Sequence, residues 1–227
     1  REGGDIHAAT ASVILGTSYA EETNSLAPDH KEHRAVAKTV NFSAIYGTSA
    51  QGLQKTLAQA GIQKSLHECK SILRNLTRGF EGLSEWQQQV KAEASLHRYS
   101  ETWLGRRRYL PDIASTDWKL RSAAERQAVN TPVQGTAADI IKIAMTRILR
   151  GLPQRTWLKP ILQIHDELVF VIPEAKLNEA AAFVRHCMEQ PPFPEFDIPL
   201  PVEISVGPTF GDLQQLPYEH EFEAKKL

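Results

Sequence analysis

The spacing of apolar residues changes near residue 150, and this change predicts the fold class. Before it, apolar residues recur mainly at helical spacing, punctuated by Gly61, Gly79 and Gly82. After it come two short β-type runs, a helix over 174–189 and a last strand over 202–206. The helices expected in the first part span 5–15, 29–46, 49–60, 65–77, 82–96, 119–129 and 132–150, with a basic-tipped hairpin at 99–113. Helices followed by a small antiparallel sheet that carries helices predict an α+β fold.

The charge is nearly balanced overall but uneven along the chain. The 227 residues hold 26 Lys and Arg against 27 Asp and Glu, a net charge of −1. Residues 174–227 hold 4 basic and 10 acidic residues, which leaves 22 basic and 17 acidic residues in 1–173. The balance excludes a nucleic-acid binder that works by bulk charge alone. The excess of basic residues in 1–173 has two interpretations. It forms a local binding site for a polyanion, or it reflects only charged side chains on solvated faces.

Cysteine content and the chain start bear on the cellular compartment. Cys69 and Cys187 lie 118 residues apart, so neither a metal spacing nor a disulfide framework follows, and a reducing compartment is expected. No apolar run approaches the roughly 20 residues of a membrane helix, so no membrane partner is expected. The chain starts without Met and without a signal peptide, which indicates a fragment or a processed chain.

A stripe of cationic and aromatic side chains occupies one predicted helix. Arg34, Lys38, Phe42 and Tyr46 recur at every fourth position, and Gly47 follows as the expected helix stop. Each step of four turns about 40°, so these side chains share one broad face over about 18 Å. Such a face suits a nucleotide, because the two cationic side chains can bind phosphates and the two aromatic rings can pack against a base. The alternative is an amphipathic helix with two core aromatics and two surface cations.

Adjacent carboxylates lie between the two β-type runs, 161–164 and 168–172. His165, Asp166 and Glu167 occupy the tight turn there. Holding like charges together is unfavourable, and a divalent cation relieves the repulsion. Hard oxygen ligands suit Mg²⁺. The alternative is a solvated hairpin turn, in which Asp is common.

Hydrogen-bonding side chains recur at every fourth position across the start of the helix expected at 132–150. Arg126, Asn130 and Gln134 can donate to the minor-groove acceptors that every base pair presents. Small residues after Gln134 let another backbone come close. The alternative is helix capping, with Asn130 or Thr131 preceding Pro132 at a helix start.

Taken together and in this order, these segments closely resemble family A DNA polymerases, the DNA polymerase I-like enzymes. The resemblance covers nearly all of residues 2–207. It implies mainly helical fingers at 1–97, the C-terminal part of a palm with a small antiparallel sheet at 98–216, and a charged tail at 217–227. The segments that carry it are Asp5-Ile-His7 before the fingers, Arg34 to Gly47 in the fingers helix, 105–112, 124–126 and 130–142 beside the duplex, 163–170 in the palm hairpin, and 202–207 in the terminal strand.

The resemblance implies template-directed DNA synthesis, the transfer of a dNTP to a primer 3′-hydroxyl with two Mg²⁺ ions. It implies that His7, Arg34 and Lys38 bind the incoming triphosphate, and that Lys38 also protonates the leaving pyrophosphate. Phe42 is expected to contact the incoming sugar and base. Tyr46 is expected to stack beside the template base. The fingers helix is expected to close over a correct pair before chemistry.

The resemblance also implies contacts to metal and to DNA. Asp166 is the expected metal ligand and a catalytic residue, with Glu167 as a nearby catalytic support. The residues expected to touch the primer–template near its terminus are Arg126, Asn130, Gln134 and His165.

The sequence departs from the family pattern near its start. The family's other catalytic aspartate, a further metal ligand, and the glutamate that excludes ribonucleotides lie upstream of Asp5, and this chain begins after both. Gly4 stands where many relatives have a charged residue, and Asp139 could replace the missing ligand only by its charge. We therefore expect the isolated chain to be inactive without the upstream polymerase region, the rest of the palm and the thumb.

Two other interpretations stay open. One is a catalytically incomplete DNA- or nucleotide-binding fragment. The other, less favoured, is a single-subunit RNA polymerase relative, because the palm hairpin of those enzymes usually has Ser where this chain has Glu167. The expected location is the cytoplasm, in a bacterial or phage-like nucleoid.

Overall fold

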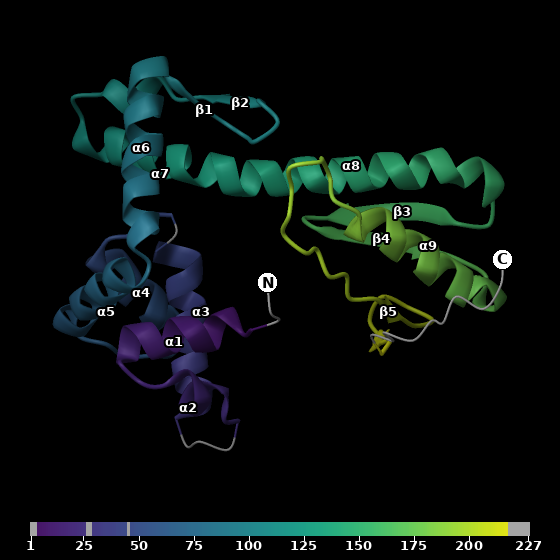
Figure 1. Cartoon of the computed structure of the whole chain (residues 1–227), viewed down its shortest axis with the longest axis horizontal. Helices are drawn as coiled ribbons and strands as arrows, with labels where there is room; N and C mark the ends of the chain where they lie inside the picture. The colour runs from purple at the N-terminus through teal and green to yellow at the C-terminus, as the bar shows by residue number, and fades with distance from the viewer. Residues whose placement is uncertain (1–3, 26–28, 45, 218–227) are drawn as a thin grey trace. The chain divides into compact units, whose positions relative to one another are not determined.

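The computed structural model describes residues 4–25, 29–44 and 46–217, which divide into two compact units (Figure 1). The first unit ends at Thr136 and the second begins at Ala137. The helix-rich first part and the small antiparallel sheets confirm the expected α+β fold. The subdomain boundaries expected from the sequence stay predictions, and the charged tail lies outside the described residues apart from Pro217.

A cluster of helices forms the first part of the first unit. Helix α1 packs against α3 and α5, and α4 packs against both of these (Figure 1). Side-chain caps start several of these helices: Asp5 caps α1, Ser49 caps α4 and Ser65 caps α5. The core between them contains Ala11, Ile14, Val36, Val40, Leu53, Leu57, Cys69 and Leu76. The helices are α1 (Ile6–Leu15), α2 (Tyr19–Thr23), α3 (His30–Ala44), α4 (Ala50–Gln59), α5 (Leu66–Gly79) and α6 (Glu81–His97).

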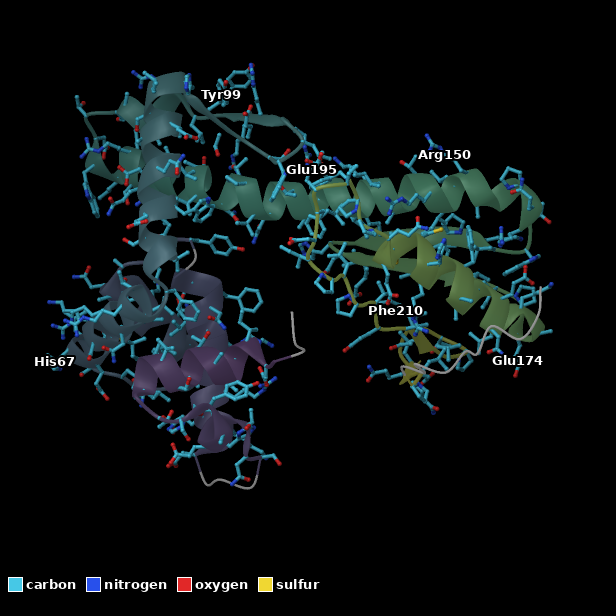
Figure 2. The ribbon with its side chains drawn as sticks, in the orientation of Figure 1. His67, Tyr99, Arg150, Glu174, Glu195 and Phe210 are labelled. Atoms are coloured by element: carbon cyan, nitrogen blue, oxygen red, sulfur yellow. The ribbon has the colours of Figure 1, made fainter. Side chains whose placement is uncertain are left out.

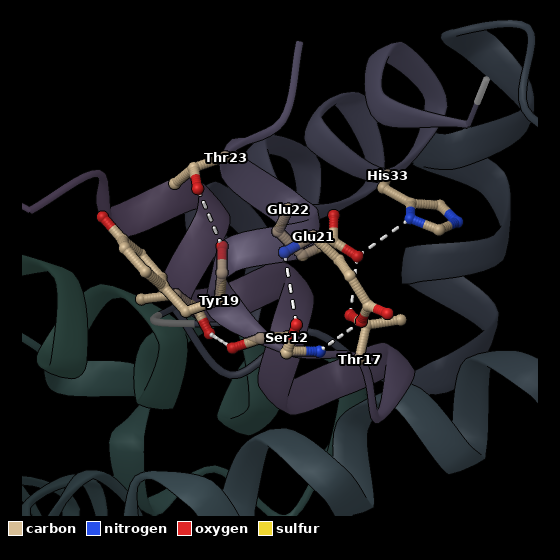
Figure 3. Close-up of polar contacts among 9 residues, drawn as sticks. Ser12, Thr17, Tyr19, Glu21, Glu22, Thr23 and His33 are labelled. Atoms are coloured by element: carbon tan, nitrogen blue, oxygen red, sulfur yellow. Dashed lines mark hydrogen bonds and ion pairs between the residues drawn. The ribbon is translucent and has the colours of Figure 1, made fainter. Parts of the chain in front are cut away.

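A buried carboxylate ties the short helix α2 to its neighbours (Figure 3). Glu22 is only 4% exposed, and it accepts a hydrogen bond from the Thr17 hydroxyl at 2.6 Å. His33 Nδ1 lies 3.0 Å from the same carboxylate oxygen, so α2 is joined to the start of α3. This contact helps to set the position of the helix that carries the cationic and aromatic stripe.

A hairpin and a helix complete the first unit. Strands β1 (Tyr99–Glu101) and β2 (Arg107–Tyr109) pair antiparallel, as the sequence predicted. Tyr99, labelled in Figure 2, lies edge-on to Tyr109, and the Arg107 guanidinium lies 4.4 Å from the centre of the Tyr99 ring. Helix α7 (Trp118–Asn130) packs against α6 and buries Ala124 and Ala128 beside Leu110 and Ile113.

The expected helix start at Pro132 is wrong. Asn130 and Thr131 have right-handed helical backbone angles and provide no side-chain cap, and α7 runs on through a π-helical turn, Thr131–Gly135, into α8 (Thr136–Gly151). Pro132 has no N–H for the Ala128 carbonyl four residues earlier. The Ser100 hydroxyl of β1 donates to that carbonyl at 2.9 Å. A tertiary contact thus lets proline sit inside a helical segment.

The second unit contains a hairpin covered by a helix. Strands β3 (Lys159–Ile164) and β4 (Glu167–Val171) pair antiparallel, and α9 (Leu177–Glu189) packs on them (Figure 1). Its core contains Ile148, Leu158, Ala180, Val184 and Cys187, with Leu168 and Phe170 of β4 against it.

The last expected strand is shorter than 202–206. Within 202–206, β5 (Ser205–Val206) pairs with β6 (Gln214–Gln215), and the Leu216 N–H donates to the Ile204 carbonyl. At the start of this span the backbone N–H of Val202 donates to the Glu189 carboxylate. None of the helices in the described ranges is both long and apolar enough to span a membrane.

Candidate functional site

Helix α3 turns its cationic and aromatic stripe toward solvent. Val36 and Val40, on the other face of the helix, are at most 1% exposed and belong to the core. Arg34 and Lys38 are exposed, and the Phe42 ring is 60% exposed. The alternative of two core aromatics is therefore wrong for Phe42. An exposed ring next to two cations is available to a ligand.

An open hollow lies beside this ring. It has a volume of about 380 Å³ and is lined by Lys38, Thr39, Phe42 and Ser43 of α3 and by Thr56 of α4. The hollow therefore offers a flat apolar surface, three hydroxyl groups and one ammonium group. Within the described part of the chain, Lys38 forms no ion pair, so its charge faces solvent.

Asp5 joins the start of α1 to the start of the stripe. One oxygen of its carboxylate accepts from the backbone N–H groups of His7 and Ala8, at 2.8 and 3.3 Å, as an N-cap. The other oxygen pairs with the Arg34 guanidinium. Burial raises the pKa of Asp5, but the hydrogen bonds from Arg34, His7 and Ala8 together lower it below its usual value. Asp5 was not predicted to have a role of its own, although its place before an apolar helical run is a capping signal.

His7 reaches the stripe through Asn41. The Asn41 amide nitrogen lies 3.1 Å from His7 Nδ1, and the Asn41 amide oxygen accepts from the Thr10 hydroxyl at 2.8 Å. Thr10 is fully buried. The structure therefore places His7 on the same side of the unit as Arg34, and it adds Asn41, which the sequence analysis did not single out.

Tyr46 and Gln134 meet although 88 residues separate them. Gln134 Nε2 donates to the Tyr46 hydroxyl at 3.0 Å. Gly47, just after Tyr46, has a φ of 71°, a left-handed conformation that favours glycine and ends the helical segment. Asn130 lies one π-helical turn from Gln134, and its Oδ1 is buried without a hydrogen-bond partner among the described residues. The end of the stripe thus contacts Gln134, whose side-chain oxygen in turn accepts from the Asn130 amide at 3.5 Å.

The basic hairpin approaches the π-helical turn at Gly135. A side chain at that position would bring its Cβ to 2.5 Å from Cγ2 of Thr102, so only glycine allows the approach. The Arg106 guanidinium donates to the Gly135 carbonyl at 2.9 Å. The backbone N–H of Trp103 donates to the Thr136 hydroxyl at 2.9 Å. Arg126, exposed on α7, donates to Ser122. These contacts gather basic and amide side chains on one part of the first unit.

The second unit carries the carboxylate turn. His165 and Asp166 form a two-residue turn, because Ile164 pairs with Glu167, the first residue of β4. The expected three-residue turn is therefore one residue too long. His165 has a φ of 53°, a conformation that costs a residue with a Cβ about 1–2 kcal/mol. Gln163 helps to hold it by donating to the His165 carbonyl at 3.1 Å.

The carboxylates of this turn fit a partial magnesium site. Asp166 and Glu167 are exposed and adjacent, and Mg²⁺ is commonly held by one or two carboxylates together with water and substrate phosphates. The described ranges contain no group of three His, Cys, Asp or Glu side chains placed to hold a metal. The fit therefore extends to one or two ligands, and the remainder would come from outside the described side chains.

Comparison with known proteins gives a consistent result. The family model "DNA polymerase family A" matches residues 1–212. The chain is 41% identical over 220 residues to "DNA polymerase I, thermostable" of Thermus filiformis, which covers 95% of this chain and 24% of that protein. It is 40% identical over 219 residues to "DNA polymerase I" of Chloroflexus aurantiacus, and this match covers 95% of this chain and 22% of that protein.

A solved structure is also similar. It is the POL domain of Pol1 from M. smegmatis in complex with DNA primer-template and dNTP, with a TM-score of 0.73 and 35% sequence identity. The match covers 86% of this chain and 32% of that one. The chain thus spans about a quarter of the length of the curated relatives it matches.

Proposed function

The chain belongs to DNA polymerase family A, and from this premise we propose that it contributes the nucleotide-binding face and one metal ligand to template-directed DNA synthesis. The reaction is transfer of a dNTP to a primer 3′-hydroxyl. The observation that carries the proposal is the exposed stripe of Arg34, Lys38 and Phe42 on α3. A core helix would bury the ring, whereas this helix presents it beside two cations.

The stripe suits a nucleoside triphosphate. Arg34 keeps guanidinium N–H groups beyond the one that pairs with Asp5, and these can bind phosphate oxygens in a forked geometry. Lys38 adds a compact charge at the edge of the hollow, where it can also give a proton to the pyrophosphate as it leaves. Phe42 offers its face to the sugar and base. His7 adds one more donor to the phosphates.

The residues around the π-helical turn suit the primer–template. The amide NH₂ groups of Asn130 and Gln134 can donate to base edges in the minor groove, and the Asn130 NH₂ now donates to Gln134 Oε1 at 3.5 Å. Gln134 also donates to the Tyr46 hydroxyl, which holds the ring while leaving its face free for a template base to stack on. Arg126 and His165 add contacts near the primer terminus. Primer–template, dNTP and the upstream polymerase region are thus the proposed partners, and a cytoplasmic, nucleoid-associated location follows from them.

Asp166 is the proposed metal ligand, and Glu167 is a support of lesser weight. The chemistry that two bound Mg²⁺ ions supply is a lower pKa of the primer 3′-hydroxyl and neutralisation of charge at the α-phosphate. The left-handed conformation of His165 closes the two-residue turn and leaves Asp166 exposed at the tip of the hairpin. We propose that a further carboxylate comes from the upstream polymerase region, because no third His, Cys, Asp or Glu side chain joins the two carboxylates of the turn within the described ranges.

The same observations define a second candidate function for the chain alone. A chain with a nucleotide-binding face and a partial metal site binds DNA or nucleotide without catalysis. In a primer-extension assay, the 227-residue chain alone is then expected to give no product. Robust extension by the chain alone would contradict the need for the upstream region.

The test of the polymerase proposal is a chimera. The upstream region of the Thermus filiformis relative is joined to this chain, and primer extension is measured with Mg²⁺. Asp166→Ala is expected to lower kcat by about a thousandfold or more, because the metal loses a fixed ligand. Glu174→Ala, an exposed carboxylate of the same unit, is the control and should leave kcat unchanged. Near-normal turnover of the Asp166 variant would reject the metal ligand.

A second variant of the chimera tests the nucleotide site. Lys38→Ala is expected to raise KM for dNTP by about tenfold or more, while the Kd for primer–template changes less than about twofold. Lys55→Ala, an exposed lysine of α4, is the control. Equal losses in nucleotide use and in primer–template binding would argue against a triphosphate contact.

A further inference from the structure

We propose that Asn41 is a positioning residue, which holds the His7 imidazole in the tautomer that carries its proton on Nε2 and so offers Nε2–H to the incoming triphosphate. The inference rests on the proposed function for the role of that donor. The orientation of the ring itself rests only on contacts within the first unit.

The hydrogen-bond chain runs from the core to the site. Thr10 of α1 is 0% exposed, and its hydroxyl donates to Asn41 Oδ1 at 2.8 Å. Asn41 Nδ2 lies 3.1 Å from His7 Nδ1. Asn41 and His7 are 34 residues apart in sequence, and both are half-buried. The hydrogen-bond chain therefore begins at a buried side chain and ends at the half-buried His7 ring.

The chemistry of these groups selects one ring form. Because the Thr10 hydroxyl donates to the amide oxygen, the amide NH₂ faces His7, and an NH₂ group can only donate. His7 Nδ1 must accept, so the proton of the neutral ring is on Nε2. The other neutral tautomer would point an N–H at the amide NH₂. Leaving both donors unmatched disfavours that tautomer by about tenfold or more.

The selected form serves the phosphate site. Asn41 lies seven residues after Arg34 and three after Lys38, so all three share one side of α3. The backbone N–H of His7 donates to the Asp5 carboxylate that also pairs with Arg34. One junction between α1 and α3 thus orders two donors for phosphate oxygens. A ring free to exchange tautomers would present an acceptor to the phosphates part of the time.

The first measurement is the tautomer itself. Two-bond ¹H–¹⁵N correlation spectra of the full chain with ¹⁵N-labelled histidine distinguish the forms, and His7→Gln assigns one signal among the 8 histidines. We expect the Nε2–H form in the wild-type chain. Asn41→Ala and Thr10→Val should reduce its excess, and Asn41→Asp, which can only accept, should place a proton on Nδ1.

A matched control exists on a neighbouring helix. Asn75 of α5 donates through its amide to the Ile14 carbonyl of α1 at 3.0 Å, so Asn75→Ala removes a similar bond between helices without touching His7. It should leave the His7 signals unchanged. An Nδ1–H form in the wild-type chain, or an unchanged Nε2–H excess in Asn41→Ala, overturns the inference whatever the nucleotide data show.

The second measurement is the affinity for dATP with Mg²⁺, by calorimetric titration of the same chains. The Asn41→Ala chain is expected to bind about three- to tenfold more weakly than wild type, the range of one hydrogen bond, and the Asn75→Ala chain equally well. If Lys38→Ala weakens binding and Asn41→Ala does not, the inference fails and the proposed function stands. If dATP does not bind the wild-type chain, or binds it and the Lys38→Ala chain equally, the proposed nucleotide site fails, and the role of His7 fails with it.

Discussion

Replacing Ser100 with alanine is expected to destabilise the chain by about 1–2 kcal/mol, because the change removes a buried hydrogen bond that a proline makes necessary. Ser100 is 6% exposed and donates to the Ala128 carbonyl at 2.9 Å. In a regular helix that carbonyl would accept from residue 132, but Pro132 has no N–H. The net value of such a bond is about 0.5–1.5 kcal/mol, and a buried carbonyl that loses its partner costs about 1–3 kcal/mol. The estimate spans the upper part of the first range and the lower part of the second.

The assay is urea unfolding of the full chain followed by tryptophan fluorescence, since Trp103 and Trp118 lie on the hairpin and on α7. With a slope of about 2 kcal/mol per molar, the midpoint should fall by about 0.5–1 M. Ser95→Ala is the control, because the Ser95 hydroxyl donates to the Lys91 carbonyl from an exposed helical position. It should change the stability by less than about 0.5 kcal/mol.

A double-mutant cycle tests the cause. Pro132→Ala restores an N–H at residue 132, so Ser100→Ala should cost less in that background, with a coupling free energy of about 0.5–1 kcal/mol. Changes in the unfolded chain caused by removing proline cancel in the cycle. A cost for Ser100→Ala equal to that of Ser95→Ala, or a coupling of zero, would refute the reasoning.

Phe42→Ala is expected to leave the free energy of unfolding unchanged within about 0.5 kcal/mol, because the ring is 60% exposed, and to lower dATP affinity about fivefold or more in a titration. A stability loss with unchanged affinity would make the ring structural. Asp5→Asn keeps a cap but loses the charge that faces Arg34. Because the pKa of Asp5 is lowered in the folded chain, its contribution is present above about pH 4 and is lost as the pH falls further, so urea midpoints at pH 7 and pH 3 should differ less in the variant. Cys69 and Cys187 are 0% and 5% exposed, and burial raises the pKa of both thiols, so a thiol reagent should modify neither before unfolding and both after it. Rapid labelling of the folded chain would contradict that burial.

Much of the secondary structure could be predicted because its causes are local. The apolar period and the capping residues predict α1, α4 and α5 to within two residues at each end. Pro132 shows where this reasoning fails. By local rules it starts a helix, whereas in the structure the Ser100 hydroxyl of strand β1 donates to the carbonyl that would otherwise accept from residue 132.

The residues of the candidate site were likewise predictable only where local spacing decides their position. Spacing alone placed Arg34, Lys38 and Phe42 on one face of a helix, because helical geometry follows from residue number. Spacing could not say whether that face meets the core or the solvent, since an amphipathic helix can present an aromatic end to either. Asn41 lies between Lys38 and Phe42 in the sequence. Its role could not be predicted from spacing, because its partner His7 is 34 residues away.

The sequence by itself determined most of the longer helices, the hairpin positions, the uneven charge and the resemblance to family A polymerases, because each depends on residue type and on short or ordered spacings. It did not predict the short helix α2 or the continuous helical path through Pro132. Only the tertiary structure decided that Phe42 is exposed, that Asp5 pairs with Arg34, that Asn41 orients His7 and that Gln134 meets Tyr46. These contacts join residues 29 to 88 positions apart. Local rules are silent there, because the choice among such contacts depends on how whole helices bury their apolar faces against one another.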